Sequence, residues 1–208
     1  MYRLNLFAVV VVFTLIVTGI LPWTAVAASE PQSSIEQTFQ KAKKDYLQKN
    51  MNSAAEQIQK GSSYMKAKAA SASVKGKEAL NASSRELEKL ADDVKKGTVT
   101  SVKRINESFA RAYLALASDS HIKSTESWTR KEAAKAGDAL DSATNYLERS
   151  FAWAGQKVET STKKTVEKSK ELSLKLKEKS SVVAEDVGKG LKDAGYEIEK
   201  FGKRISPK

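Results

Sequence analysis

The stretch 102-VKRINESFARAYLALASDSHIKSTESW-128 decides the fold of this chain. Its apolar residues recur every three or four positions, at Val102, Ile105, Phe109, Ala112 and Leu116, and Tyr113 and Leu114 widen the same face. This period places them along one side of an α-helix. Such a helix is stable when its apolar face packs against other helices, so the stretch predicts an all-α bundle.

A first helix is expected upstream, over residues 33–46. Ser33 and Glu36 have the spacing of a capping box, and an apolar face with helical period starts at Ile35. The polar segment 48–52 predicts a turn after this helix.

The second helix is expected to run over residues 51–94, with a weak point near Gly76. Its end is predicted at 95-KKG-97, because cations suit the negative end of the helix dipole and glycine turns left-handed without steric cost. Thr98 or Thr100 is expected to cap the next helix.

A fourth helix is expected after residues 129–132, with apolar residues as far as Val158. Residues 39–75 and 121–157 also resemble each other at an offset of 82 residues, each being a helix, a short turn and a longer helix. Matching pairs include Tyr46 with Trp128, Lys49 with Lys131, Ala54 with Ala136 and Ile58 with Leu140. A duplication and the shared composition of alanine-rich helices both account for the match. Residues 33–160 are therefore predicted to form a four-helix bundle or two stacked helical hairpins.

The turn in the second copy resembles that of tetratricopeptide hairpins. The resemblance rests on Trp128, the segment 131-KEAAKAGDAL-140 and Tyr146-Leu147, and so covers residues 128–147. In that family such a turn joins an aromatic residue on one helix to an Ala/Leu-rich second helix, which implies a helical hairpin here. The chain as a whole is similar to small, secreted, all-helical bacterial proteins.

Residues 161–208 are predicted to form a basic amphipathic extension. The segment 160–181 is rich in Lys, Glu and Ser and is expected to be a solvated continuation of the fourth helix. Beyond it, apolar residues recur every three or four positions beside cations: Val183, Val187, Leu191, Ala194, Ile198, Phe201 and Ile205, with Lys192, Lys200, Lys203 and Arg204. This composition is similar to that of late-embryogenesis-abundant and apolipoprotein-like proteins.

Three interpretations of this last face stay open at the level of sequence. In the first, the helix folds back on the bundle or pairs with a second copy of the chain. In the second, it lies on an anionic membrane surface with its lysines toward the phosphates. In the third, the glycines at positions 188, 190 and 195 keep it disordered.

The first 27 residues have the layout of a secretory signal. Arg3 precedes an apolar run over residues 7–21, and a short tail at 28–32 separates the signal from the first helix. The cut site that fits this layout has small residues on both sides of the bond, namely Ala25, Ala27 and Ala28. We therefore expect export to the periplasm. The alternatives are an uncleaved anchor in the inner membrane and secretion; a lipid anchor is excluded because the chain has no cysteine.

The composition excludes several classes of function. The net charge of +11 comes from 36 Lys and Arg interspersed with 25 Asp and Glu, which is typical of solvated helical surfaces, so no nucleic acid is expected as a partner. The single histidine, His121, lies near an apolar face and is expected to be structural. No catalytic, cofactor-binding or metal-binding residue is assigned, and no small-molecule substrate is expected.

We therefore expect an exported, non-enzymatic helical protein that acts in the cell envelope through contacts with a protein partner or with itself. The alternative is a peripheral membrane protein that binds through residues 183–205.

Overall fold

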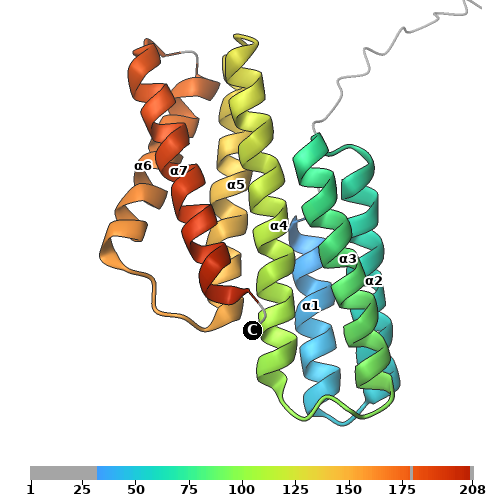
Figure 1. Cartoon of the computed structure of the whole chain (residues 1–208). Helices are drawn as coiled ribbons and strands as arrows, with labels where there is room; N and C mark the ends of the chain where they lie inside the picture. The colour runs from blue at the N-terminus through green and yellow to red at the C-terminus, as the bar shows by residue number, and fades with distance from the viewer. Residues whose placement is uncertain (1–31, 179, 207–208) are drawn as a thin grey trace, which may run out of the picture. The chain divides into compact units, whose positions relative to one another are not determined.

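The computed structural model describes residues 32–178 and 180–206 (Figure 1). Within these residues it contains seven α-helices and no β-strand, which confirms the predicted all-α class. The expected signal segment 1–27 and its cut site lie outside the described residues. The helices are α1 (Gln32–Leu47), α2 (Met51–Ala70), α3 (Val74–Lys95), α4 (Val102–Thr129), α5 (Ala133–Ala154), α6 (Thr160–Lys177) and α7 (Ala184–Ile205).

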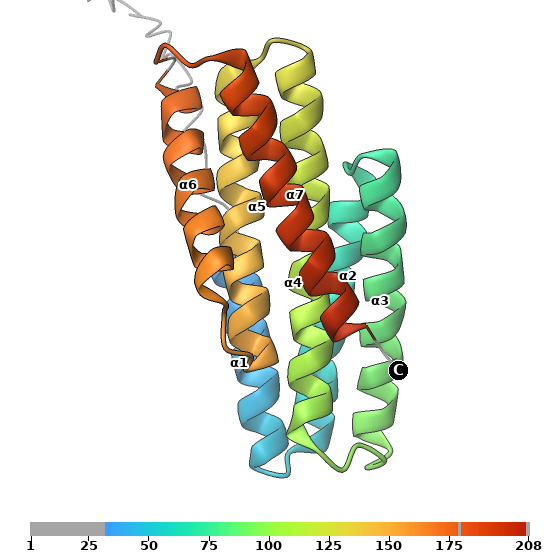
Figure 2. The same cartoon turned by 60° about the vertical axis from the view of Figure 1, so that its left-hand side comes forward.

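The helices form two four-helix bundles that share α4 (Figures 1 and 2). In the first bundle α1, α2, α3 and α4 pack in chain order and α1 also contacts α4. In the second bundle α4, α5, α6 and α7 pack in the same way and α7 contacts α4. With 28 residues, α4 is about 42 Å long and can serve both bundles. The expected bundle of helical hairpins is therefore present, with more helices than predicted.

The prediction of a single helix over residues 51–94 is wrong, because the chain turns at residues 71–73 and forms α2 and α3. The hydroxyl of Ser73 accepts a hydrogen bond from the backbone N of Gly76 at 3.0 Å and so caps α3. The carboxylate of Asp119 on α4 accepts a hydrogen bond from Ser73 N at 3.0 Å. A serine cap anchored to a distant helix therefore breaks the helix, three residues before the glycine.

The cap of α4 also differs from the expectation. Ser101, rather than Thr98 or Thr100, caps this helix, since its hydroxyl accepts a hydrogen bond from Lys103 N at 3.1 Å. The predicted end of the preceding helix is present, because α3 stops at Lys95 and Gly97 adopts a φ of +71°.

The segment expected to continue the fourth helix is a separate helix. α5 ends at Ala154, and Gly155 at its C-terminus adopts a left-handed φ of +62°. The chain then reverses and α6 packs back along α5. Residues 161–208, expected as an extension, thus supply two helices of the second bundle.

The two matching turns of the sequence repeat have the same backbone structure. Among the described residues, Lys49 and Lys131 are the non-glycine residues with positive φ, at +65° and +60°. The N–H of Lys49 donates to the carbonyl of Tyr46 at 3.0 Å, and that of Lys131 to the carbonyl of Trp128 at 2.9 Å. The offset of 82 residues therefore relates two equivalent turns.

The equivalence extends to whole helices. α2 and α5 begin 82 positions apart, at Met51 and Ala133, and so do α4 and α7, at Val102 and Ala184. All the buried residues of α6 stand 82 positions after buried residues of α3, in the pairs Leu80 and Thr162, Ser84 and Val166, Leu87 and Ser169, Ala91 and Ser173, Val94 and Leu176. The first and second bundles are therefore structurally equivalent.

An aromatic cluster joins the two bundles. Phe39 of α1 stacks on Phe109 of α4 with ring centroids 4.0 Å apart, and Trp153 of α5 meets both rings edge-on at 6.3 and 5.0 Å. The carboxylate of Glu36 accepts hydrogen bonds from Tyr113 Oη at 2.6 Å and Trp153 Nε1 at 3.2 Å. Glu36, expected in a capping box, therefore ties α1 to α4 and α5.

Candidate functional site

The apolar face of α7, predicted from the sequence as a partner or membrane surface, lies inside the second bundle. Exposed fractions of 7% or less are found for Val187, Leu191, Ile198, Phe201 and Ile205. Val183, just before α7, is 63% exposed, and Lys192 on its outer side is exposed too. The arrangement present here is thus the one in which the helix folds back on the bundle.

The other cations predicted beside this face form ion pairs. Lys200 and Arg204 both reach Glu159 in the α5–α6 connection, with N–O distances of 2.7 and 3.2 Å. Lys203 pairs with Glu199 of its own helix at 2.7 Å. Lys200, with a smaller contribution from Arg204, holds the pKa of Glu159 below its usual value. These contacts connect the end of α7 to the start of α6.

Backbone contacts hold α7 close to α4. Arg111 of α4 donates to the carbonyl of Ile205 at 3.0 Å, and His121 Nε2 donates to the carbonyl of Leu191 at 2.8 Å. A Cβ atom at Gly195 would lie 2.6 Å from the His121 ring, so glycine is needed for this close approach. His121 therefore positions a helix in the described structure. Membrane binding through this face would require α7 to leave α4 and α5.

A groove of about 690 Å³ opens between α6 and α7. Its α6 side carries Lys164, Lys168 and Lys175, and its α7 side carries Asp186 and Asp193. Lys175 pairs with a glutamate of its own helix at 2.7 Å, whereas the other four groups form no ion pair within the part of the chain that the structure describes. The groove is also lined by Glu171 on its α6 side, by Glu178 at the end of α6, and by Lys189 on its α7 side.

The equivalent positions of the first bundle form ion pairs across α3 and α4. These pairs are Glu86–Arg111 and Asp93–Arg104 in the first bundle, and their counterparts 82 positions later are Lys168–Asp193 and Lys175–Asp186 in the second. The signs are exchanged, but each counterpart is again a cation opposite an acid. The paired charges are in contact across α3 and α4, whereas their counterparts on α6 and α7 are not. The second bundle is therefore more open between α6 and α7 than the first is between α3 and α4.

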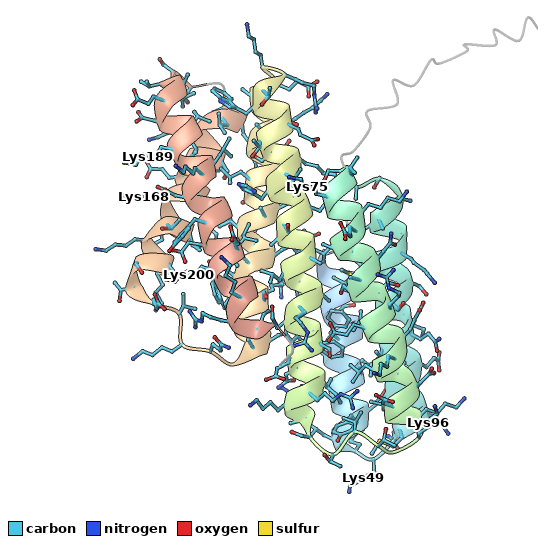
Figure 3. All side chains as sticks on the ribbon, viewed as in Figure 1. Lys49, Lys75, Lys96, Lys168, Lys189 and Lys200 are labelled. Carbon is cyan, nitrogen blue, oxygen red and sulfur yellow. The ribbon has the colours of Figure 1, made fainter. Side chains whose placement is uncertain are left out.

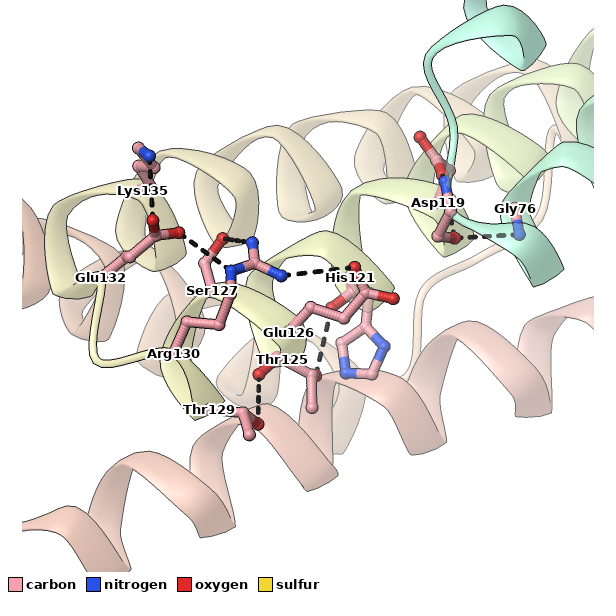
Figure 4. Close-up of polar contacts among 11 residues, drawn as sticks. Gly76, Asp119, His121, Thr125, Glu126, Ser127, Thr129, Arg130, Glu132 and Lys135 are labelled. Carbon is pink, nitrogen blue, oxygen red and sulfur yellow. Dashed lines mark hydrogen bonds and ion pairs between the residues drawn. The ribbon is translucent and has the colours of Figure 1, made fainter.

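A polar cluster lies where the α2–α3 turn meets α4 (Figure 4). The buried carboxylate of Asp119 accepts hydrogen bonds from Ser73 N and Oγ at 3.0 and 3.2 Å and pairs with Lys123 at 2.7 Å. A Cβ atom at Gly76 would lie 2.0 Å from Asp119 Oδ1. Because its acceptors are satisfied by the chain itself, Asp119 acts as an anchor for the start of α3. Figure 4 also shows the ion pairs at the α4–α5 turn, among Arg130, Glu132 and Lys135.

The lysines are spread over both bundles (Figure 3). Lys49 and Lys96 lie near the same end of the first bundle, whereas Lys168 and Lys189 belong to α6 and α7. α6 alone holds six lysines against two glutamates, a net charge of +4 in 18 residues. The excess positive charge is therefore densest on the helix that borders the groove.

Residues 32–178 and 180–206 contain no group of three or more His, Cys, Asp or Glu that could hold a metal ion. Within the same residues, no helix combines the length and the hydrophobicity that a membrane span requires. Comparisons with protein-family models, curated proteins and solved structures give no match for this chain.

Sequence reasoning missed the α6–α7 groove. The sequence predicts that residues 160–181 continue the preceding helix, which gives a groove beside α7 no second wall. The glycine at position 155 was the available signal for a helix end, since glycine is the residue that most often adopts the left-handed conformation there.

Proposed function

We propose that this chain is an exported, non-enzymatic helical protein that acts in the cell envelope through protein–protein contacts. Export is supported by the signal layout of residues 1–27. The mode of action is supported by the groove between α6 and α7, which borders the most cationic helix and has acids on its other side. Charges of both signs beside a helix–helix groove select and orient a partner by complementarity.

The observation that carries this proposal is the separation of complementary charges. Lys168 and Asp193 stand at the positions of Glu86 and Arg111, which are in contact in the first bundle. Separated charges are free to pair with another chain. An exposed ion pair contributes roughly 0.2–1 kcal/mol, so such charges give specificity more than affinity.

Sedimentation velocity of the protein isolated from the cell envelope after mild cross-linking tests this proposal. We expect a species heavier than the monomer, and a mature N-terminus at Ala28. The variant Lys164→Glu/Lys168→Glu changes the groove and should lose the heavier species. Lys49→Glu/Lys96→Glu makes the same change of charge on the first bundle and should retain it.

Two results would overturn the proposal. The first is a strict monomer in every fraction. The second is equal behaviour of the two charge variants, which would separate the assembly from the groove.

A further inference from the structure

α6 buries fewer apolar side chains than α3, the helix that stands in the equivalent place of the first bundle. Where α3 buries Leu80, Leu87 and Ala91, α6 buries Thr162, Ser169 and Ser173 at the equivalent positions. Among its buried residues, only Val166 and Leu176 are apolar. Because helix association depends on buried apolar area, α6 is held less firmly than α3.

The surface that α6 covers is more apolar than α6 itself. α5 and α7 contribute to it two buried polar residues, Thr144 and Glu197, and six buried apolar residues, Ala136, Leu140, Ala143, Leu147, Ala194 and Ile198. A small void lies between this surface and Val166 and Ser169. The slot on α5 and α7 is therefore filled in part by small polar side chains of α6.

Contacts with α4 and α5 hold α7 in addition to its contacts with α6. Arg111 and His121 of α4 hold backbone carbonyls of α7, and Phe201 packs on Phe151 of α5 with ring centroids 4.2 Å apart. α7 can therefore remain in place when α6 moves.

The polar ties of α6 to its neighbours are partly exposed. They are Lys170 with Glu148 at 2.6 Å, Lys177 with Asp141 at 2.9 Å and with Asp138 at 3.6 Å, and a buried hydrogen bond from Thr162 Oγ1 to Glu197 at 2.7 Å. Exposed ion pairs add little to the stability of a helix, so these ties do not replace the missing apolar contacts.

We propose that α6 is a displaceable helix, and that the slot it covers on α5 and α7 is the docking site for an amphipathic partner helix with the apolar pattern of α3. This inference rests on the proposed function, for which it names the surface and the chemistry of the partner. The pattern of α3 fits because α3 fills the equivalent slot on α2 and α4. The two slots differ at Glu197, which stands at the position of Ala115 and accepts a hydrogen bond from Thr162. In the docked state, a leucine and an alanine of the partner take the places of Ser169 and Ser173, and a threonine keeps the hydrogen bond to Glu197.

Hydrogen exchange of the full chain measures the displacement of α6. We expect the amides of α6 to exchange at least about tenfold faster than those of α3 and α7. The variant Ser169→Leu/Ser173→Ala restores the residues of α3 and should slow exchange in α6 at least about threefold without changing α3. Thr162 is kept because it binds Glu197, and Ser169→Val is a smaller filling should leucine overpack the void. If α6 exchanges as slowly as α3, the proposal is wrong.

A labelled peptide with the sequence of α3, Val74–Lys95, and the single change Leu80→Thr to bind Glu197 tests docking on the full chain by fluorescence anisotropy. The control peptide carries in addition Leu87→Ser and Ala91→Ser, the residues of α6. We expect the α3 peptide to bind at least about tenfold more tightly than the control, and less tightly to the Ser169→Leu/Ser173→Ala protein. Equal affinity of the two peptides, or absence of binding, overturns the docking site. Both measurements use the purified chain without material from the cell envelope, so their outcome is distinct from that of the sedimentation experiment.

Discussion

Replacing Phe39 by alanine tests how firmly α1 packs on α4 and α5. The ring is fully buried, at 0% exposure, stacks on Phe109 at 4.0 Å and lies against Gly61, where a Cβ atom would come within 2.5 Å. Truncating a core phenylalanine to alanine costs about 3–5 kcal/mol, and the loss of three aromatic neighbours places this site in the upper half of that range. We expect a loss of about 4 kcal/mol in the free energy of unfolding. For a urea slope of roughly 2–3 kcal/mol per M, the midpoint falls by about 1.3–2 M.

Urea unfolding followed by tryptophan fluorescence measures this effect, because Trp153 lies in the same cluster, 5.0 Å from the Phe109 ring. Leu47→Ala is the control, since Leu47 is on the same helix but 59% exposed, and its effect should stay within about 0.5 kcal/mol. A loss below about 1.5 kcal/mol for Phe39→Ala, or similar losses for both variants, would contradict the placement of α1.

Three further predictions concern polar and close contacts. Arg111→Met should lower the free energy of unfolding, measured in urea, by about 2 kcal/mol, because Glu86 and the Ile205 carbonyl lose their donor. Arg111→Lys should recover only part of this stability, and an Arg111→Met protein as stable as the wild type would refute the contribution of these contacts. Gly76→Ala should cost about 1–3 kcal/mol, since its Cβ atom would lie 2.0 Å from Asp119; a melting temperature like that of the exposed control Lys77→Ala would rule out this crowding. Burial raises the pKa of Glu36, but hydrogen bonds from Tyr113, Gln40 and Trp153 and the charge of Arg149 outweigh it, so the net shift is downward. The carboxylate therefore stabilises the fold above its ordinary pKa of 4.5 and this contribution is lost as the pH falls below that value; Glu36→Gln should remove this part of the pH dependence of unfolding, and an unchanged profile would speak against it.

Helical faces with a strong period could be predicted from the sequence. The face of α4 from Ile105 to Leu116 and that of α7 from Val187 to Ile205 are both buried. Large apolar residues at helical spacing lie on one side of a helix, and this side leaves water by packing against other helices. The sequence does not show whether other helices of the chain, a second copy or a membrane cover the apolar face of α7. The structure adds that α4, α5 and α6 cover it.

Features that depend on distant residues could not be predicted. The break between α2 and α3 requires Asp119, which lies 46 positions after Ser73 and reaches it only in the folded chain. The sequence predicts a solvated continuation in the place of α6, because the positions that α6 buries carry Thr162, Ser169 and Ser173, which are as polar as surface residues. The groove depends on where α7 crosses its neighbours, and this is set by tertiary contacts such as that of Gly195 with His121.

The claim that best separates a protein-contact function from membrane binding is that the apolar face of α7 stays packed in the second bundle. The chain has no cysteine, so Ile205→Cys and Tyr196→Cys each create a single thiol, at sites that are 6% and 62% exposed. Ile205 lies outside the slot that α6 covers, so its exposure reports on the packing of α7 itself. The rate of maleimide labelling, with and without anionic lipid vesicles, measures the accessibility of both thiols. The account predicts labelling of Ile205→Cys at least about tenfold slower than that of Tyr196→Cys, with both rates unchanged by vesicles. Equal rates in buffer, or a change of the Ile205→Cys rate when vesicles are added, would contradict it.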